Sequence, residues 1–236
     1  MEKVSIIIPS YNRFKFLLNA IQSVREQTHT NIEIIVINDC STEKEYYEYD
    51  FGKDITVLHL DQNSKVALGN SSAGHVRNFG IHLATGDYIA FLDDDDQWFP
   101  KKLELQIMKM KETGCKMSCT AGFYGHGVYD KSKTYKTISS DADFLIIKYA
   151  FSLQDYDLDD GYPEIWNLEF LKIHNCCVTS SVIVTKDLVK KVGFMKSIRY
   201  AEDYDYWLRV LEHTDCVYIK DICFYYDLKH GYGINY

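Results

Sequence analysis

Short apolar runs alternate with amphipathic stretches through the first half of the chain. Continuous apolar runs of this length predict buried strands, and apolar positions spaced three or four apart predict helices. The expected strands are residues 4–8, 32–37, 55–60 and 87–92, and the expected helices are residues 14–27, 46–51, 75–85 and 101–113. This alternation is typical of a mostly parallel sheet flanked by helices, which makes the fold class α/β.

The second half of the chain follows a less regular pattern. Strands are expected at residues 116–120, 178–184, 216–219 and 222–226, and helices at residues 141–151, 185–192 and 203–213. Residues 122–135 are rich in Gly and Tyr and suggest a hairpin, and residues 154–164 form an acidic loop. No linker interrupts the chain, so we expect one domain over residues 1–236 with a change of character near residue 115.

Four apolar residues run directly into four consecutive carboxylates, Asp93 to Asp96. Like charges this close repel, and a nearby cation relieves the repulsion. Mg²⁺ and Mn²⁺ prefer carboxylate oxygen, so the run is a candidate metal site; a solvated acidic turn is the alternative. Asp39 also follows an expected strand, and sites in parallel sheets form beyond the carboxyl ends of strands. We therefore expect Asp39 and Asp93 to face one crevice.

The composition narrows the class of protein. The chain has 236 residues and a formal net charge of −8, which argues against a nucleic-acid partner. Its seven cysteines lack the spacing of a zinc site, so reduced thiols and a cytoplasmic location are expected. No signal peptide is recognisable, and no apolar run approaches the roughly 20 residues of a transmembrane helix. Peripheral attachment to a membrane is compatible with this pattern.

Five segments, in this order, resemble the family 2 glycosyltransferases. They are VSIIIPSYNR at 4–13, VINDCST at 36–42, AGHVRN at 73–78, GDYIAFLDDDD at 86–96 and AEDYDYWLR at 201–209. The resemblance implies the GT-A fold, with a nucleotide-sugar donor bound by residues 1–114 and an acceptor bound by residues 115–236. It also implies transfer of the sugar with inversion at the anomeric carbon.

The resemblance assigns the nucleoside to the loop after the first strand. It implies donor contacts from Pro9, Ser10, Tyr11 and Arg13, although a purely structural turn is the alternative. Asp39 is implied to accept a hydrogen bond from the uracil ring N–H, which favours a UDP-sugar.

One neighbouring position departs from the family pattern. The family more often has Asp where this chain has Asn38.

Arg77 is implied to lie near the base or the diphosphate, because its guanidinium offers a fixed fork of hydrogen-bond donors. Pairing of Arg77 with an Asp of the acidic run is the alternative.

The acidic run corresponds to the Asp-x-Asp motif of the family. The resemblance implies that Asp93 lies near the ribose and the metal, Asp94 near the ribose or sugar, and that Asp95 binds Mn²⁺ or Mg²⁺ directly. His230 corresponds to a late His that binds the metal or a phosphate. The metal would stabilise the departing diphosphate.

The second pair of adjacent carboxylates, Glu202-Asp203, corresponds to residues on the acceptor-binding side of the family. Asp203 corresponds to the catalytic base and Glu202 to an acceptor-binding residue, although a carboxylate at a helix start is also stabilised without catalysis. A nucleotidyltransferase is one rival, but the loop at 9–13 lacks its glycines. A non-catalytic nucleotide- or carbohydrate-binding module is the other, and the presence of both Asp95 and Asp203 argues against it. The acceptor, whether glycan, lipid or protein, is not specified.

Overall fold

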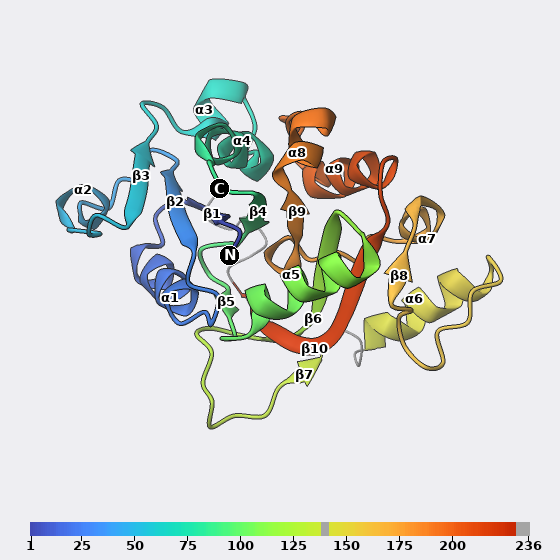
Figure 1. The fold of residues 1–236 in the computed structure, drawn as a ribbon. Helices are drawn as coiled ribbons and strands as arrows, with labels where there is room; N and C mark the ends of the chain where they lie inside the picture. Colours follow the sequence, from blue (N-terminus) through green and yellow to red (C-terminus); the bar gives the residue numbers. More distant parts are fainter. Residues whose placement is uncertain (138–141, 230–236) are drawn as a thin grey trace.

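A central sheet runs through both halves of the chain in the computed structural model, which describes all residues except 138–141 and 230–236 (Figure 1). The strands are β1 (Val4–Ser10), β2 (Ile32–Asn38), β3 (Ile55–His59), β4 (Tyr88–Phe91), β5 (Gln97–Trp98), β6 (Met117–Gly125), β7 (Lys136–Thr137), β8 (Ile165–Trp166), β9 (Ile183–Thr185) and β10 (Cys216–Asp227). The helices are α1 (Phe14–Arg25), α2 (Glu45–Glu48), α3 (Ser64–Leu68), α4 (Ala73–Leu83), α5 (Lys102–Thr113), α6 (Ala142–Ser152), α7 (Leu168–Ile173), α8 (Lys186–Val192) and α9 (Glu202–Leu211), with a 3-10 turn η2 (Thr179–Ser181).

The strand order is β3-β2-β1-β4-β9-β6-β10-β5, with β7 beside β6 and β8 beside β10. The first four strands of this order are parallel, as are β6 and β10, and β9 joins the two groups in the antiparallel sense. The expected α/β class with a mostly parallel sheet is therefore confirmed. Because β4 and β6 both pair with β9, the two halves of the chain share one sheet.

Side chains alternate between two cores on opposite faces of the sheet, as the period of two in a strand requires. On one face Ile7 and Phe91 pack with α4 and α9, and Phe91 contacts the Trp207 ring edge-on. On the other face Ile6 and Ile8 pack with α1 and α5. Trp207, 0% exposed, is a core residue.

Several local expectations are wrong. The first strand, expected to end at residue 8 before Pro9, continues through Pro9 to Ser10 as β1. The two strands expected after residue 215 are one strand, β10, which has an irregularity between Ile219 and Ile222. The strand expected at 178–184 begins only at Ile183, because the preceding residues form the turn η2.

A buried polar network links α5 to the strands beneath the acidic run. Lys102 is fully buried, lies 4.1 Å above the Trp98 ring and donates to Gln106 Oε1 at 2.6 Å. Gln106 in turn donates to the carbonyls of Ser118 and Ser181. Burial lowers the pKa of Lys102 to about 7, because desolvation penalises the charged ammonium.

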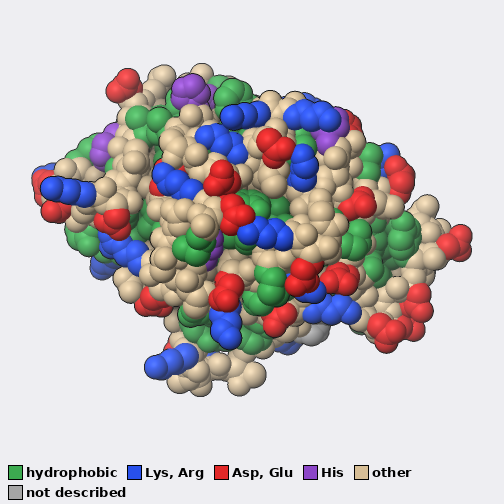
Figure 2. Space-filling view, in the orientation of Figure 1, with side chains coloured by type: hydrophobic (Ala, Val, Ile, Leu, Met, Phe, Trp, Pro, Cys, Tyr) green, Lys and Arg blue, Asp and Glu red, His purple; other side chains and the backbone are tan. Residues whose placement is uncertain are grey.

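Two global expectations also concern this structure. All seven cysteines are unpaired, as expected for reduced thiols. Within residues 1–137 and 142–229, no helix combines the length and the apolar character needed to cross a bilayer. The surface in Figure 2 mixes acidic and basic side chains over most of the visible face.

Candidate functional site

The carboxyl ends of β1, β2 and β4 meet at one edge of the sheet. Ser10 ends β1 opposite Asn38 of β2, and β4 pairs with the other side of β1. Asp39 and Asp93 follow β2 and β4, so the structure places both at this edge, as the topology predicts. The sheet therefore gathers polar side chains from segments far apart in sequence.

Arg13, at the start of α1, lies beneath the acidic run. Its Nη1 donates to Asp94 Oδ1 at 3.1 Å and to Asp95 Oδ2 at 3.0 Å. Ser10 Oγ donates to Asp94 Oδ2 at 2.6 Å. Asp94 and Asp95 are each only 2% exposed, so the alternative of a solvated acidic turn is wrong. Arg13 and Ser10 thus hold the carboxylates of Asp94 and Asp95 in place in this structure.

The acidic run is also anchored from the far side of the sheet. Ser180, in η2, donates through its hydroxyl to Asp96 and accepts at 3.0 Å from the backbone N–H of Asp93. The backbone N–H of Asp227 donates to the other Asp96 oxygen at 3.0 Å. Asp96 is fully buried and acts here as a structural support for the turn that presents Asp93 to Asp95.

Burial and mutual repulsion keep protons on this run. Desolvation, and for Asp95 the neighbouring Asp94 charge, raises the pKa of Asp94 to about 6 and that of Asp95 to about 8. Arg13 acts in the opposite direction but does not compensate for burial. Arg13 alone does not neutralise these carboxylates, so full ionisation of the run requires a further cation in place of the bound protons.

Arg77, on α4, connects the two acidic constellations. It is 4% exposed, and its two terminal nitrogens donate to Asp93 Oδ1 and, at 3.5 Å, to Glu202 Oε1. Pairing with the acidic run, the alternative considered for this residue, is what the structure shows. The same guanidinium brings the start of α9, and hence Asp203, to the edge where β4 ends.

Asp203 lies in the first turn of α9 and is held by two donors. Thr179 Oγ1 donates to Asp203 Oδ2 at 3.0 Å, and the backbone N–H of Tyr204 donates to Oδ1 at 2.7 Å. Ala201, at φ +56°, turns the chain immediately before the helix. A non-glycine residue in the left-handed region is uncommon, which indicates that the turn is over-determined by its surroundings. Burial raises the pKa of the neighbouring Glu202.

Asp39 is fully buried and fastens β2 to α3. Its Oδ1 accepts from the Ser64 N–H at 2.8 Å, and its Oδ2 accepts from Ser64 Oγ at 2.7 Å and Asn63 Nδ2 at 3.1 Å. Desolvation raises the pKa of Asp39. The sequence pattern did not predict α3, whose five residues are too few to show helical periodicity.

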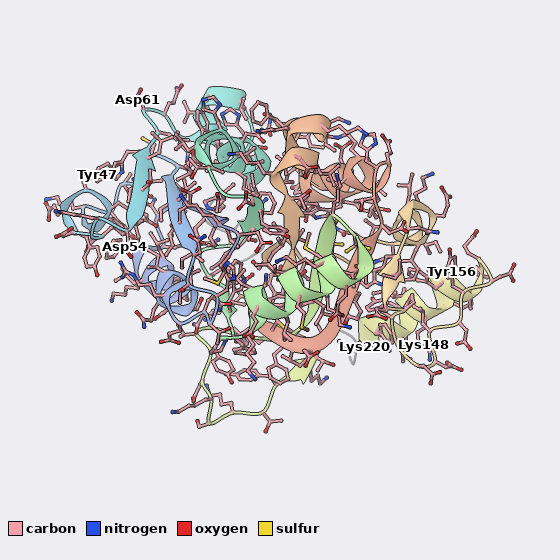
Figure 3. The ribbon with its side chains drawn as sticks, viewed as in Figure 1. Tyr47, Asp54, Asp61, Lys148, Tyr156 and Lys220 are labelled. Atoms are coloured by element: carbon pink, nitrogen blue, oxygen red, sulfur yellow. The ribbon has the colours of Figure 1, made fainter. Side chains whose placement is uncertain are left out.

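An aromatic pair that the sequence did not suggest stands at the end of β3. Tyr47, labelled in Figure 3, stacks on His59 with ring centroids 4.8 Å apart. His59 Nδ1 is 2.9 Å from Asn38 Nδ2, which ties the pair to β2. Of the other predicted donor residues, Pro9 is buried within β1 and Tyr11 is half-buried in the loop that follows. His230 lies outside the described residues.

The donor set suits a hard divalent cation. The site contains six carboxylates, Asp93 to Asp96, Glu202 and Asp203, and two guanidinium groups, those of Arg13 and Arg77, which pair with four of them. Carboxylate oxygen is the ligand that Mn²⁺ and Mg²⁺ favour. As the side chains stand, no cluster of three or more acidic, His or Cys groups in the described part of the chain is arranged around a metal position. The carboxylates are therefore of the right chemical type to bind a divalent cation, but their side chains do not converge on one position in this structure.

The fold and this carboxylate-lined edge define a protein of the GT-A class. A structure of S. aureus TarS residues 1–349 in complex with UDP-GlcNAc superposes with a TM-score of 0.70 at 20% identity, covering 97% of this chain and 59% of that one. The mannosyltransferase PcManGT of Pyrobaculum calidifontis, in complex with GDP-Man and Mn²⁺, gives a TM-score of 0.65 at 13% identity over 98% and 59% of the two chains. Both likenesses establish the GT-A fold.

Sequence similarity then establishes the family. The chain belongs to Glycosyl transferase family 2, whose family model matches residues 5–190. An uncharacterized glycosyltransferase of Rickettsia typhi is 32% identical over 222 residues, which cover 93% of this chain and 62% of the relative. The chain thus spans less than two thirds of that relative. Family membership, expected from the five motifs, is confirmed.

Proposed function

We propose that this chain transfers a sugar from a UDP-sugar to an acceptor hydroxyl, with inversion at the anomeric carbon. The observation that carries the proposal is Arg77, which joins the end of β4 at Asp93 to the start of α9 at Glu202. A donor held at the acidic run would therefore lie beside Asp203. Family membership and a neighbour solved with UDP-GlcNAc support the donor class.

The proposed reaction is a single displacement. The acceptor oxygen attacks the anomeric carbon from the face opposite the diphosphate, the bond from that carbon to the diphosphate oxygen breaks, and UDP leaves. The acceptor proton moves to Asp203, whose carboxylate is oriented by Thr179 and the Tyr204 N–H. No covalent bond to the protein is required. Residues 1–114 would bind the donor and residues 115–236 the acceptor.

Asp95 and Asp93 are the residues proposed to hold Mn²⁺ or Mg²⁺, with His230 as a further ligand. A bound divalent cation supplies charge stabilisation to a departing diphosphate. Arg13 would keep Asp94 and Asp95 in place, and Asp39 would accept from the uracil ring N–H once its bonds to Ser64 rearrange.

Hydrolysis of the donor tests the base without knowledge of the acceptor, because water replaces the acceptor hydroxyl. We expect Asp203→Asn to reduce UDP release from UDP-sugars by about 100-fold or more, since an amide cannot accept the proton. UDP affinity should stay within about twofold. The matched control is Asp205→Asn on the same helix, where the carboxylate pairs with Lys196 and Arg209. Equal loss in both variants, or full turnover in Asp203→Asn, would place the base elsewhere.

A further inference from the structure

Exposed apolar side chains and unburied lysines gather on one surface beside the site. This surface, called here the α4–α8 face, comprises α4, α8 and residues 194–201, which lead into α9. Its exposed apolar residues are Phe79, Leu83, Phe194, Ile198 and Tyr200, and its cations are Lys186, Lys190, Lys191 and Arg199. Figure 2 shows Lys and Arg side chains over this upper part of the molecule, where Figure 1 places α4 and α8.

Contacts between the three segments make the α4–α8 face continuous. Asn78 of α4 exchanges two hydrogen bonds of 2.9 Å with the backbone of Met195, and His75 Nδ1 is 3.3 Å from Ser197 Oγ. A groove of about 420 Å³ lies between α4 and α8. Its lining includes Ile81, Ile89, Val189, Phe194, Lys186 and Lys190. The groove therefore combines a mostly apolar lining with two lysines.

The charge of the α4–α8 face is opposite to that of the whole chain. The chain carries a formal net charge of −8, whereas this face presents several cations. Asp187, the acidic residue of α8, is paired with Lys116 at 2.7 Å, and Lys196 is paired with Asp205. The Lys186 amine donates to the Ala84 carbonyl at 2.7 Å, and Lys190 and Lys191 are exposed close to Phe194 in the sequence.

This combination matches the surface of an anionic bilayer. Large apolar side chains that gather on a soluble domain mark an interaction surface. Aromatic and aliphatic groups enter the boundary between headgroups and acyl chains, while lysines are attracted to anionic headgroups. Lysine stems also extend along apolar surface and keep their amines among polar groups. Phe194, 54% exposed, and Tyr200, 71% exposed, are placed to enter first.

We propose that the α4–α8 face docks this protein on the surface of an anionic phospholipid bilayer. The face begins at the site: a Cβ on Gly74, in the first turn of α4, would lie 2.7 Å from Glu202 Cγ. From there α4 extends only about 15 Å, at about 1.5 Å per residue. If the proposed transfer function holds, a docked molecule presents Asp203 to acceptors carried at the membrane surface.

Co-sedimentation of the full chain with vesicles tests this proposal. We expect binding to phosphatidylcholine vesicles that contain phosphatidylglycerol, weakened by added salt, and little binding to phosphatidylcholine alone. Lys190→Gln/Lys191→Gln should weaken binding about 30-fold, because each lysine near an anionic surface contributes about fivefold in affinity and the two factors multiply. Phe194→Ser should weaken it about tenfold through lost apolar burial.

Two matched variants control for charge and for exposed apolar area elsewhere. Lys131→Gln/Lys133→Gln removes two lysines between β6 and β7, and Leu145→Ser removes a 68% exposed leucine from α6. Both should bind vesicles as the wild type does. Figure 3 shows that the α6 region, marked by Lys148, lies at the edge of the molecule away from α4.

Three results would overturn the proposal. They are no binding to either vesicle, equal binding to both, or an equal loss in the Lys131/Lys133 and Lys190/Lys191 variants. Loss of a wild-type dimer on Phe194→Ser, without vesicle binding, would assign the face to a second copy. No donor is present in this assay, so its failure leaves the proposed transfer function standing. Failure of UDP-sugar turnover likewise leaves the vesicle result intact.

Discussion

The buried guanidinium of Arg77 offers a quantitative test of the site. Arg77→Met keeps an unbranched apolar stem but removes the charge that Asp93 and Glu202 share. Their side chains are 28% and 12% exposed, and the Arg77 side chain is 5% exposed. Removing one partner from a fully buried pair costs about 3–5 kcal/mol. Because Asp93 retains solvent contact, we expect the lower end, about 3 kcal/mol.

Thermal and urea unfolding measure this change. For a chain of this length, about 3 kcal/mol corresponds to a fall in Tm of about 6–12 °C. The control is Arg25→Met, which removes an exposed pair with Asp54 and should cost at most about 1 kcal/mol.

The loss should also depend on pH. Without Arg77, the folded-state pKa of Glu202 rises further above its unfolded value. The resulting loss of folding stability is complete at pH values above the folded-state pKa, and it shrinks as the pH falls toward the unfolded pKa of about 4.3. The loss should therefore be larger at pH 7.5 than at pH 5. A loss equal to that of Arg25→Met, or one that does not vary with pH, would refute the buried charge network.

Two further predictions concern the metal and α5. Asp95→Asn should remove the Mn²⁺-dependent part of UDP affinity. Calorimetric titration of UDP in the presence of Mn²⁺ and of EDTA measures this part, and an unchanged Mn²⁺ dependence would contradict a role of Asp95 in metal binding. Lys102→Met should stabilise the fold at pH 7, by at most about 5 kcal/mol, because the folded-state pKa is lowered from 10.5 to about 7. This gain should shrink as the pH rises toward 10, since the unfolded lysine also becomes neutral; an equal gain in urea melts at pH 7 and 9.5 would contradict it.

Much of the first half of the chain could be predicted from sequence, because its strands are continuous apolar runs. β1, β2 and β4 are largely buried, so their positions follow from hydrophobicity, and the half-exposed edge strand β3 still has an apolar run. The second half obeys weaker patterns. Local hydrophobicity assigns the polar pair Lys220-Asp221 to a turn. β10 nevertheless continues across this pair, because its pairing with β6 resumes after a register shift.

The acidic side chains of the site were predictable as candidates, but their partners were not. Arg13 and Asp94 are 81 positions apart, and the parallel pairing of β1 with β4, the strands that precede them, brings them together. Thr179 and Ser180 read as part of a strand in sequence. They form η2 because their hydroxyls bond to Asp203 and Asp96, which is a tertiary cause that no local pattern reveals.

A thermal-shift comparison of UDP, GDP, CDP, ADP and dTDP, each with and without Mn²⁺, tests whether the site binds a uridine nucleotide through a metal. A ligand that binds only the folded state stabilises it by about 2.7 kcal/mol at 100 times its Kd, which here is a rise in Tm of about 5–11 °C. We expect UDP with Mn²⁺ to give this rise in Tm and UDP without metal to give a much smaller one. A rise with GDP instead of UDP, or no rise with any nucleotide, would contradict it.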